Sequence, residues 1–421
     1  MDILVVGGGG REHAIVRKLK ESPRCDKLYC TPGNGGISRD AECFDVAATD
    51  IPGVVALAKK LKVDMVFVAP DDPLVAGMVD ALEAEGIATF GPNAKAAVLE
   101  GSKVFSKQLM KKYSIPTARY EVFDKPQEAL DYIRRQDCYP AVIKADGLAL
   151  GKGVILCDTY EQAREAVRDI MENRIFGESG SRVVVEEFLT GPEVSVLAFT
   201  DGHTIRPMVS AKDHKRAFDG DMGPNTGGMG TISPNPHYTQ VDADWCMEHI
   251  FQPTVDAMRK EGRPFKGCLF FGLMLTPDGP KVIEYNCRFG DPETQVVLPR
   301  LKTDLIDILF AIREECLAQL EIEWADDACA CVVMASGGYP AAYRKGLEIE
   351  GLYPDGQCAD AIVYHAGTVC RDGHFYTNGG RVLGVTAKAP TVDQALDRAY
   401  EAVRGIRFEN AHYRKDIGKT K

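Results

Sequence analysis

The sequence predicts a protein of several α/β and α+β domains that begins with a parallel sheet. Its 421 residues correspond to about three domains of ordinary size. In the first hundred residues, short runs rich in Val and Ile alternate with helical patterns, and this alternation is typical of a parallel sheet that helices cover on both faces. From the patterns that follow, we expect four regions, with the bounds 1–101, 102–190, 191–326 and 327–421.

The first two regions have clear strand and helix patterns. In the region 1–101 we expect strands at 3–6, 27–30, 44–47, 64–69 and 87–90, and helices at 11–20, 52–61 and 73–85. In the region 102–190 we expect helices at 102–112, 126–135 and 161–172, strands at 120–123, 141–144, 154–157 and 183–187, and a glycine-rich turn at 145–153.

The last two regions contain a long loop and a hairpin. In the region 191–326 the patterns predict a strand at 194–200, a polar glycine-rich loop at 212–236, a helix at 245–261, a hairpin at 267–290 and a helix at 305–319. The region 327–421 returns to short strands, with Asp372-Gly373 as a hairpin signal and a closing helix at 392–404.

Composition and charge exclude several classes of function. The chain carries 61 acidic and 50 basic residues, a net charge of −11, which argues against broad binding to nucleic acid or to an anionic membrane. No apolar run approaches the roughly 18 residues of a membrane-spanning helix, and the N-terminus lacks the features of a signal peptide. None of the 13 cysteines forms a C-x-x-C pair, so we expect reduced, buried thiols in a cytosolic protein.

A strand, four glycines (7–10) and a helix open the chain. The G-x-G-x-x-G fingerprint of dinucleotide-binding domains needs a third glycine where Glu12 stands, and it needs an acidic residue after the second strand, where Cys30 leads into Thr31-Pro32-Gly33. Backbone N–H groups at a helix start still bind anions. We therefore predict a pocket for one phosphate with Arg11 as its charge partner, while a tight turn without a ligand is the alternative.

A second glycine-rich turn runs from Gly147 to Gly153. It is not a Walker A motif, because its glycine spacing is too short and Gly153 stands where that motif needs Ser or Thr. A glycine hairpin that carries Lys152 can still cover a triphosphate and donate N–H groups to it. Lys144 ends the preceding strand and can reach the same phosphates, although a solvated lysine is the alternative.

The hairpin at 267–290 has the most informative polar pattern. Alternation along its second strand places Val282, Glu284, Asn286 and Arg288 on one face and Ile283, Tyr285, Cys287 and Phe289 on the other, core-packed face. A carboxylate, an amide oxygen and a guanidinium at this spacing suit a hard cation beside an anion. The alternative is an exposed polar face, but the next residues, 290–293, form a turn that keeps further polar groups beside the strand end.

Two further segments are candidates for function. Glu186-Glu187 end a strand, and such a strand end can offer its backbone to an adenine edge while Glu193 accepts ribose hydroxyls; an ordinary interdomain crossover is the alternative. The segment 213–230 is rich in glycine and opens with a dense cluster of ionisable residues. Loops of this length in compact enzymes are usually functional or disordered, and the ionisable cluster favours function.

Together these segments resemble the glycinamide ribonucleotide synthetases, or phosphoribosylamine–glycine ligases, of the ATP-grasp superfamily. The resemblance spans the whole chain, and its most specific marker is RFGDPE after a Glu-x-Asn strand. The segments that carry it are GGGGREHA (7–14), PGN (32–34), GPN (91–93), GSKVFSK (101–107), KADGLALGKGV (144–154), EEFLTGPEVS (186–195), DHKRAFDGDMGPNTGGMG (213–230), EYNCRFGDPE (284–293) and TNGGRVLGV (377–385).

The resemblance implies an N-terminal α/β substrate domain, an ATP-grasp core of two subdomains (a lid, 102–190, and a larger half, 191–326) and a small C-terminal mixed α/β domain. It implies that ATP drives the ligation of glycine to 5-phosphoribosylamine through glycyl phosphate, a step of purine biosynthesis, with Mg²⁺ or Mn²⁺ on the triphosphate. A lid must exclude water from the acyl phosphate, and 144–153 is the candidate. The partners are then small molecules, with no nucleic acid and no membrane, in a cytoplasmic enzyme expected to be a monomer, with a dimer as the alternative.

The resemblance also implies roles for individual residues. Those expected at ATP are Lys103, Lys144, Gly147, Gly151, Lys152, Gly153, Glu186, Glu187, Phe188, Leu189 and Glu193. Those expected at the metal are Glu284 and Asn286. The expected catalytic residues are Arg288, at the glycine carboxylate, Asp213, at the glycine amine, and Lys215. Those expected to bind the substrates are Gly9, Gly10, Arg11, Glu12, Pro32, Gly33, Asn34, Asn225, Thr226, Gly227 and Gly228, of which the 7–12 loop and 32–34 hold the phosphoribosyl group. Lys212, Phe270 and Thr231-Ile232 depart from the residues common in the family.

Two other functions compete. One is another ATP-grasp carboxylate–amine ligase or a carboxylase acting on a phosphoribosyl substrate, and the segment 284–293 argues against it. The other is a nicotinamide-dependent oxidoreductase, and the missing third glycine argues against that. ADP release across a substrate panel tests the first alternative, and NADH binding or absorbance tests the second.

Overall fold

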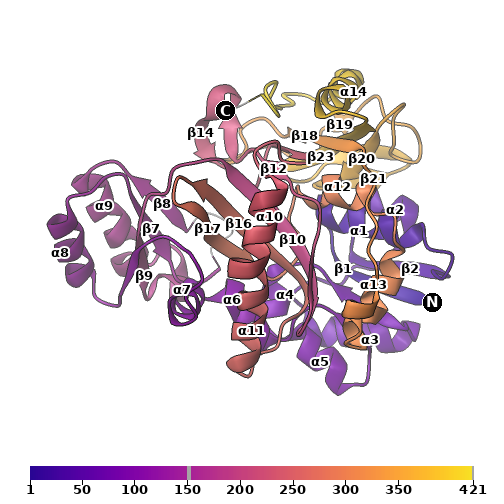
Figure 1. Ribbon diagram of the computed structural model, residues 1–421. Coiled ribbons are helices and arrows are strands. Elements are labelled where there is room, and N and C mark those ends of the chain that lie inside the picture. Colours follow the sequence, from indigo (N-terminus) through magenta and orange to yellow (C-terminus); the bar gives the residue numbers. More distant parts are fainter. Residues whose placement is uncertain (149–152, 420–421) are drawn as a thin grey trace.

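The computed structural model describes residues 1–148 and 153–419 (Figure 1). The N-terminal sheet has the strand order β3-β2-β1-β4-β5, and all of its neighbours pair in parallel. The predicted parallel sheet is therefore confirmed. Its strands are β1 (Asp2–Gly7), β2 (Lys27–Pro32), β3 (Glu42–Cys43), β4 (Met65–Val68) and β5 (Thr89–Phe90). Its helices are α1 (Gly10–Lys20), α2 (Ile37–Asp40), α3 (Ile51–Leu61), α4 (Asp71–Val75) and α5 (Met78–Ala84).

Two predicted elements of this region are wrong. The expected strand at 44–47 is absent, and the strand in this part of the chain, β3, ends at Cys43. Thr31 Oγ1 lies within hydrogen-bond distance of the carbonyl oxygens of Phe44 (2.9 Å) and Val46 (2.7 Å), so a side chain engages this backbone in place of a strand. The helix expected at 73–85 is divided into α4 and α5, because Gly77 between them has a φ of +90°, outside the helical range.

The second sheet forms a lobe at one side of the molecule, with α8 and α9 on its outer face (Figure 1). Its strand order is β6-β9-β7-β8, and every pair is antiparallel. Ile133 of α8 and Ala163 of α9 pack with Ile143 of the sheet in a small core of this lobe. The elements from residue 94 to residue 187 are α6 (Ala94–Gly101) and α7 (Lys103–Lys112), which pack on the main core, and those of the lobe: β6 (Tyr120–Phe123), α8 (Pro126–Gln136), β7 (Ala141–Ala145), β8 (Val154–Cys157), α9 (Tyr160–Val167), a π-helix (Arg168–Glu172), a 3-10 helix (Gly177–Gly180) and β9 (Val183–Glu187).

The third sheet is the centre of the molecule, with the antiparallel order β11-β10-β16-β17. The expected helix at 245–261 is only partly confirmed, since α10 and α11 are joined by a π-helical turn. Pro253 lies just after this turn and has no N–H for the regular ladder. The elements are β10 (Glu193–Asp201), β11 (Ile205–Pro207), α10 (Gln240–Cys246), the π-helix (Met247–Phe251), α11 (Gln252–Lys260), β16 (Lys266–Thr276), β17 (Gly279–Asn286), α12 (Thr294–Val297), a 3-10 helix (Leu298–Arg300), α13 (Leu305–Arg313) and a 3-10 helix (Leu317–Gln319).

The segment expected as a long loop, 212–236, contains strands. It holds β12 (Lys212–Asp213), β13 (Arg216–Phe218), a 3-10 helix (Asp219–Asp221), β14 (Met222–Asn225) and β15 (Gly230–Ser233). Strand β15 pairs with β18, and Ile232 is buried in the core behind that strand. The loop prediction was wrong for β15 because its partner β18 lies about a hundred residues further along the chain, beyond the reach of local pattern. Strands β12 to β14 pair within the segment itself.

The C-terminal sheet has the order β12-β15-β18-β23-β20, so strands from two distant segments of the chain share it. A smaller sheet, β19-β22-β21, contains the predicted hairpin at Asp372-Gly373. All 13 cysteines carry free thiols. Within residues 1–148 and 153–419, no helix has the length and apolar character needed to cross a membrane. The elements are β18 (Ala328–Ala335), β19 (Glu348–Ile349), β20 (Ile362–His365), β21 (Thr368–Arg371), β22 (His374–Thr377), β23 (Arg381–Ala389) and α14 (Val392–Gly405).

Candidate active site

A lysine in the segment between β12 and β13 contacts two of the predicted site carboxylates. Lys215 Nζ lies 3.3 Å from Glu193 Oε2 and 3.7 Å from Glu284 Oε1. Glu193 begins β10 and Glu284 lies on β17, while Lys215 follows β12. The predicted ribose, metal and glycine residues therefore meet around one ammonium group.

Positive charge gathers around Glu284. Burial alone would raise the pKa of this carboxyl, but the ammonium groups of Lys215 and Lys144 outweigh it, and the pKa is lowered. Lys103 acts on Glu284 in the same direction, and burial lowers its own pKa. The site therefore keeps an ionised carboxylate beside several cations, which is an arrangement suited to a polyanionic ligand that carries a metal ion.

The strand that carries Glu284 contains a β-bulge. Gly272 pairs with Glu284 and Leu273 pairs with Val282, so Ile283 has no opposite residue. Val282 therefore turns into the core, where it is fully buried, and the prediction that it shares the polar face was wrong. Ile283, expected in the core, is only partly buried, and its carbonyl oxygen accepts a hydrogen bond from Lys144 Nζ at 3.1 Å.

A buried glutamate connects two lysines of the lobe. Glu186 Oε2 lies 3.0 Å from Lys107 Nζ and 3.1 Å from Lys144 Nζ. Its other oxygen, Oε1, is buried and has no hydrogen-bond partner among the described residues. Burial lowers the pKa of Lys107 to about 8. Lys144 therefore contacts Glu186 within the lobe sheet, and its hydrogen bond to Ile283 connects this sheet to the third sheet.

The segment proposed to frame adenine lies at the end of β9. Glu187 contacts Arg119 at 2.6 Å and Lys281 at 3.8 Å, and hydrogen bonds with Arg119 help to lower its pKa although burial opposes them. Phe188 is largely exposed, and Leu189 is half-buried. Thus an apolar side chain stands open to solvent where the chain leaves the lobe.

The glycine turn between β7 and β8 is described only at its ends. Lys103 Nζ donates a hydrogen bond to the Gly147 carbonyl at 2.9 Å. A Cβ at Gly147 would lie 2.2 Å from Ser179 Oγ, so only glycine fits here. Gly153 accepts a hydrogen bond from Ala145 N at 2.8 Å. The predicted phosphate residues Gly151 and Lys152 lie outside the described residues.

Arg288 is held by two carboxylates that the sequence prediction omitted. Its Nη2 lies 3.0 Å from Glu100 Oε1 and 3.6 Å from Asp71 Oδ2. Glu100 and Asp71 raise the pKa of the guanidinium against the effect of burial. Arg288 Nε is buried and has no partner among the described residues, so one donor is left for an anion.

The two glycine loops of the N-terminal sheet lie against each other. Gly33 N donates to the Gly7 carbonyl at 3.1 Å, and Asn34 Nδ2 donates to the Gly8 carbonyl at 2.9 Å. Pro32 ends β2 beside Gly7, the end of β1. The predicted residues from 9–12 and 32–34 are thus brought together at the carboxyl ends of two parallel strands, where ligands commonly bind in such sheets.

Glu12 in the first turn of α1 already forms hydrogen bonds with neighbouring residues of the glycine loop. Gly9 N donates to Glu12 Oε2 at 2.6 Å, and Arg11 Nε lies 2.6 Å from Glu12 Oε1. Arg11 Nη1 also donates to the Phe289 carbonyl at 3.2 Å. A Cβ at Gly10 would lie 2.6 Å from Gln295 Nε2, so α12 packs closely on this turn. Arg11 therefore connects the glycine loop to the segment that carries Arg288.

Two carboxylates interact electrostatically beside Lys215: Asp213, which is half-buried, and Glu293, which is buried. Burial raises the pKa of Asp213 well above its usual value, and the nearby Glu293 raises it further. Burial likewise raises the pKa of Glu293, whose Oε1 accepts a hydrogen bond from Ser195 Oγ at 3.0 Å. Such a pair favours a proton or a cationic ligand between its members.

The glycine segment after β14 closes over this pair. A Cβ at Gly228 would lie 2.6 Å from Asp213 Oδ1, and Gly228 also has a φ of +112° that favours glycine. Thr226 N and Oγ1 both donate to the Lys215 carbonyl, at 2.7 and 2.8 Å. Gly227 accepts a hydrogen bond from Arg381 of β23. The predicted Asn225 pairs with Arg216 across β13 and β14 and is exposed.

The side-chain oxygens of Glu284 and Asn286 suit a divalent metal ion that also binds the phosphates of a nucleotide. Glu284 and Asn286 are two residues apart on β17 and both are half-buried. The described residues contain no group of three or more His, Cys, Asp or Glu that could hold a metal alone. Mg²⁺ is usually bound by one or two carboxylates together with substrate phosphates and water, so two oxygen donors beside three lysines fit that group.

Sequence reasoning missed five polar residues of the site: Asp71, Glu100, Lys107, Glu293 and Arg381. Lys107 ends GSKVFSK, so this motif was a signal that lysines beyond Lys103 could matter, whereas Glu100 lies just before it and carried no signal. Arg381 lies in TNGGRVLGV, so that motif was its signal. Asp71 carried no signal, because only the folded chain brings α4 to this place.

The fold and the site define the class of protein as an ATP-grasp enzyme. Lys144 connects two antiparallel sheets, and the hairpin of β16 and β17 carries Glu284, on which three lysines act. The chain belongs to the phosphoribosylglycinamide synthetase family, which confirms the resemblance seen in the sequence. Residues 1–100 match the N domain of that family, residues 101–294 its ATP-grasp (A) domain and residues 329–420 its C domain.

Relatives span the whole chain. The phosphoribosylamine–glycine ligase of Caldanaerobacter subterraneus subsp. tengcongensis is 49% identical over 99% of both chains. The trifunctional purine biosynthetic protein adenosine-3 of Bos taurus is 48% identical over 99% of this chain, which covers 41% of that longer protein. The crystal structure of phosphoribosylamine–glycine ligase from Thermotoga maritima superposes with a TM-score of 0.87 at 33% identity, covering 99% of this chain and 100% of that one.

A second group of structures shares only the fold. The biotin carboxylase domain of the Hydrogenobacter thermophilus 2-oxoglutarate carboxylase, solved with MgADP and bicarbonate, has a TM-score of 0.76 at 16% identity over 98% of this chain and 91% of that one. At that identity the likeness indicates the ATP-grasp architecture alone.

Proposed function

We propose that this enzyme ligates glycine to 5-phosphoribosylamine at the expense of ATP, giving glycinamide ribonucleotide, ADP and phosphate in purine biosynthesis. The observation that carries the proposal is the full-length match to ligases of this name, at up to 49% identity among the relatives above. The site supports it, because Lys103, Lys144 and Lys215 converge on Glu284 where a triphosphate needs cations.

The first chemical step activates the glycine carboxylate. A carboxylate oxygen forms a bond to the γ-phosphorus of ATP, the bond from that phosphorus to the β,γ-bridging oxygen breaks, and ADP departs with the electron pair. In this proposal, Lys103 and Lys144 neutralise the phosphates while the free Nε donor of Arg288 orients the carboxylate. Asp213, beside Glu293, binds the glycine ammonium group.

The second step transfers the acyl group. The amine nitrogen of phosphoribosylamine attacks the glycyl carbon, the bond from that carbon to the phosphate oxygen breaks, and the nitrogen loses a proton as phosphate leaves. The loops at 9–12 and 32–34 hold the phosphoribosyl group in this proposal, and Arg11 supplies positive charge beside them. The segment 225–228 and the turn at 147–153 are proposed to exclude water from the acyl phosphate.

Glu284 and Asn286 would hold the divalent cation, and 186–189 with Glu193 would frame the adenosine. When bound, Mg²⁺ or Mn²⁺ supplies charge neutralisation on the triphosphate. Lys215 positions Glu284 and Glu193 by its contacts with both. Titration of each cation into the metal-free protein, with ADP release as the readout, separates the two metals.

The decisive experiment measures ADP release from ATP and glycine, with and without freshly made phosphoribosylamine. The proposal requires release that depends on both substrates. Release that depends on bicarbonate, or on another carboxylate with phosphoribosylamine absent, would favour the ATP-grasp alternatives.

We further propose a monomeric, cytoplasmic enzyme without nucleic-acid or membrane partners. Sedimentation tests the monomer, and cell fractionation tests the location.

A further inference from the structure

One residue of the C-terminal sheet forms hydrogen bonds both with α1, just after the first glycine loop, and with the second glycine loop. His365 ends β20, and its backbone N–H donates to His13 Nδ1 at 2.8 Å. Its carbonyl oxygen accepts a hydrogen bond from Asn34 Nδ2 at 2.7 Å. His13 lies on α1 directly after the first loop, while Asn34 lies in the second. A single residue thus connects two loops that are separated from it by more than 300 positions.

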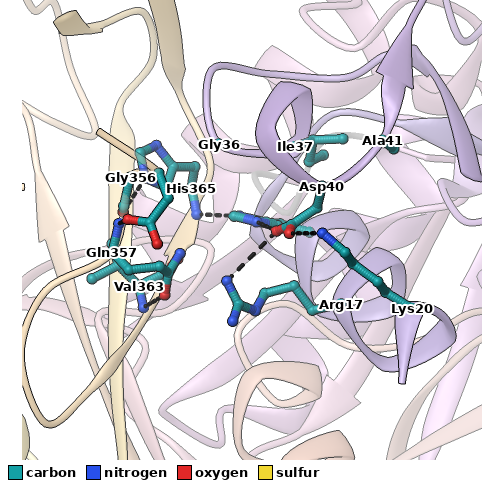
Figure 2. Close-up of polar contacts among 12 residues, drawn as sticks. Arg17, Lys20, Gly36, Ile37, Asp40, Ala41, Gly356, Gln357, Val363 and His365 are labelled. Atoms are coloured by element: carbon teal, nitrogen blue, oxygen red, sulfur yellow. Dashed lines mark hydrogen bonds and ion pairs between the residues drawn. The ribbon is translucent and has the colours of Figure 1, made fainter. Parts of the chain in front are cut away.

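The partners of His13 fix its proton. Because Nδ1 accepts the N–H of His365, the ring proton must lie on Nε2, which donates to Asp40 Oδ2 at 3.1 Å. Burial lowers the pKa of His13, in keeping with a neutral ring. Asp40 in turn meets Arg17 at 3.5 Å and Lys20 at 2.9 Å, and Figure 2 shows these two side chains converging on it. His13 is therefore held in one orientation and one tautomer.

Asn34 is saturated with hydrogen bonds. Its Nδ2 donates to the carbonyl oxygens of Gly8 and His365, and its Oδ1 accepts from Gly36 N at 3.0 Å and Ile37 N at 2.9 Å. One amide therefore joins the first loop, the second loop and β20. A change in any of these segments must move the others or break a partly buried hydrogen bond.

The contact between the second loop and β20 leaves no space. A Cβ at Gly36 would lie 2.3 Å from Cγ of His365, so only glycine allows the approach. Gly35 N donates to the Thr368 carbonyl at 3.0 Å. The His365 ring is itself fixed, with Nε2 donating to the Gly356 carbonyl at 2.8 Å and Nδ1 accepting from Thr368 Oγ1 at 3.0 Å. Figure 2 shows His365 between Gly356 on one side and Gly36 and Asp40 on the other.

We propose that His13 is a positioning residue for phosphoribosylamine, which acts by holding the two glycine loops in register through the backbone of His365. This inference rests on the proposed function, in which those loops hold the phosphoribosyl group. His13 does not touch the reacting atoms in this proposal. Its acceptor Nδ1 sets the distance between the start of α1 and β20, and β20 sets the place of the second loop through Asn34.

Two substitutions at the same position separate this role from general stability. H13N places an amide oxygen near the former Nδ1 and so keeps an acceptor for His365 N–H. H13Q places its amide near the former Nε2, keeps the contact with Asp40 and leaves the His365 N–H without an acceptor. V363A is the matched control, because Val363 is a fully buried residue of the same strand that packs in the C-terminal core.

Steady-state kinetics with each of the three substrates varied in turn give the readout. H13Q should raise KM for phosphoribosylamine about tenfold, the consequence of one unpaired buried N–H, and leave KM for ATP and glycine within about twofold. H13N should restore KM for phosphoribosylamine to within about threefold of wild type. V363A should lower Tm without changing that KM. If H13Q does not fold, G36A should give the same selective rise, because its methyl group displaces the second loop from the His365 ring.

Three results overturn the inference while the proposed function stands: an unchanged KM for phosphoribosylamine in folded H13Q or G36A, an equal rise of all three KM values, or H13N as impaired as H13Q. A selective rise of this KM in V363A would do the same, because stability alone would then explain it. Wild-type protein that releases no ADP in response to phosphoribosylamine would instead overturn the proposed function, and this inference with it.

Discussion

The carboxylate of Glu100 contacts the guanidinium of Arg288 at 3.0 Å across the seam between α6 and the end of β17. Glu100 Oε2 also accepts hydrogen bonds from Cys287 N at 2.7 Å and from Cys287 Sγ at 3.0 Å. A single buried carboxylate thus fixes both the backbone and the side chain at the strand end. Arg288 is proposed to bind the glycine carboxylate, and its orientation depends on Glu100, which lies 187 positions before Cys287 in the chain.

The first prediction concerns this contact. E100Q keeps the size of the side chain but removes its charge, so Arg288 loses one of its two carboxylate partners. We expect KM for glycine to rise about tenfold, because a hydrogen bond between charged groups is worth roughly 1.5–3 kcal/mol, and Tm to fall by a few degrees. Glycine-dependent ADP release and a thermal melt measure both. E128Q, an exposed change on α8, is the control, since surface pairs contribute little.

The second prediction concerns the first glycine loop. R11A removes the contacts with Glu12 and with the Phe289 carbonyl. We expect kcat/KM for phosphoribosylamine to fall by about tenfold to a hundredfold, the range for losing one charge-assisted contact, with much smaller changes for ATP and glycine. Equal losses for all three substrates would show that Arg11 supports the fold of the loop and does not bind substrate.

Local elements could be predicted well from the sequence. The strands expected at 120–123, 154–157 and 183–187 have those bounds in the structure, because each is a short apolar run with clear turn residues beside it. The bulge at Ile283 could not be predicted. It arises from the pairing of β16 with β17, and strict alternation along one strand contains no sign of an extra residue.

Candidate site residues could be predicted where a motif placed several polar groups close together in the chain. Glu284 and Asn286 are of this kind, and their predicted roles stay proposals. Glu100 could not be predicted, since it lies at the end of an ordinary helix and acquires its partners only through long-range packing. Arg381 lies in the quoted motif TNGGRVLGV, but its contact with Asp291 at 3.1 Å could not be predicted, since it forms only through the packing of the C-terminal sheet.

The third prediction concerns the dependence of stability on pH. The pKa of Asp213 is raised by burial and by Glu293, so the folded state binds its proton more tightly than the unfolded chain. Stability from this group is present below its unfolded pKa of about 4 and is lost as pH rises through its higher folded pKa. D213N removes that loss. The Tm difference between D213N and wild type should therefore become more positive as pH rises from 4 to about 8.

Scanning calorimetry of both proteins across this pH range measures the difference. D213N should also use glycine poorly, because an amide cannot pair with the ammonium group, so the variant gains stability while it loses activity. A Tm difference that stays constant with pH would contradict the raised pKa. Glycine kinetics equal to wild type would contradict the assigned role of Asp213 without affecting the stability argument.

The last prediction concerns the metal-binding strand. In E284Q, an uncharged amide replaces an ionised carboxylate that lies 3.7 Å from Lys215. The amide cannot neutralise a cation, so turnover at low Mg²⁺ should fall about a hundredfold, the usual cost of about 3 kcal/mol for one transition-state charge contact. ADP affinity should largely survive, because Lys144 and 186–193 are proposed to hold the nucleotide. N286A should act in the same direction with a smaller effect, and the exposed change E350Q should have none.

Turnover across a Mg²⁺ titration, with ADP binding and a thermal melt alongside, tests the assignment. Lost turnover with retained ADP binding and an unchanged Tm would place the defect at the metal. A fall in Tm would instead mean that Glu284 chiefly offsets the charge of Lys215, since removing one partner leaves the other uncompensated. If E284Q turns over within about threefold of wild type at low Mg²⁺, Glu284 does not bind the metal, and the polar face of β17 has another role.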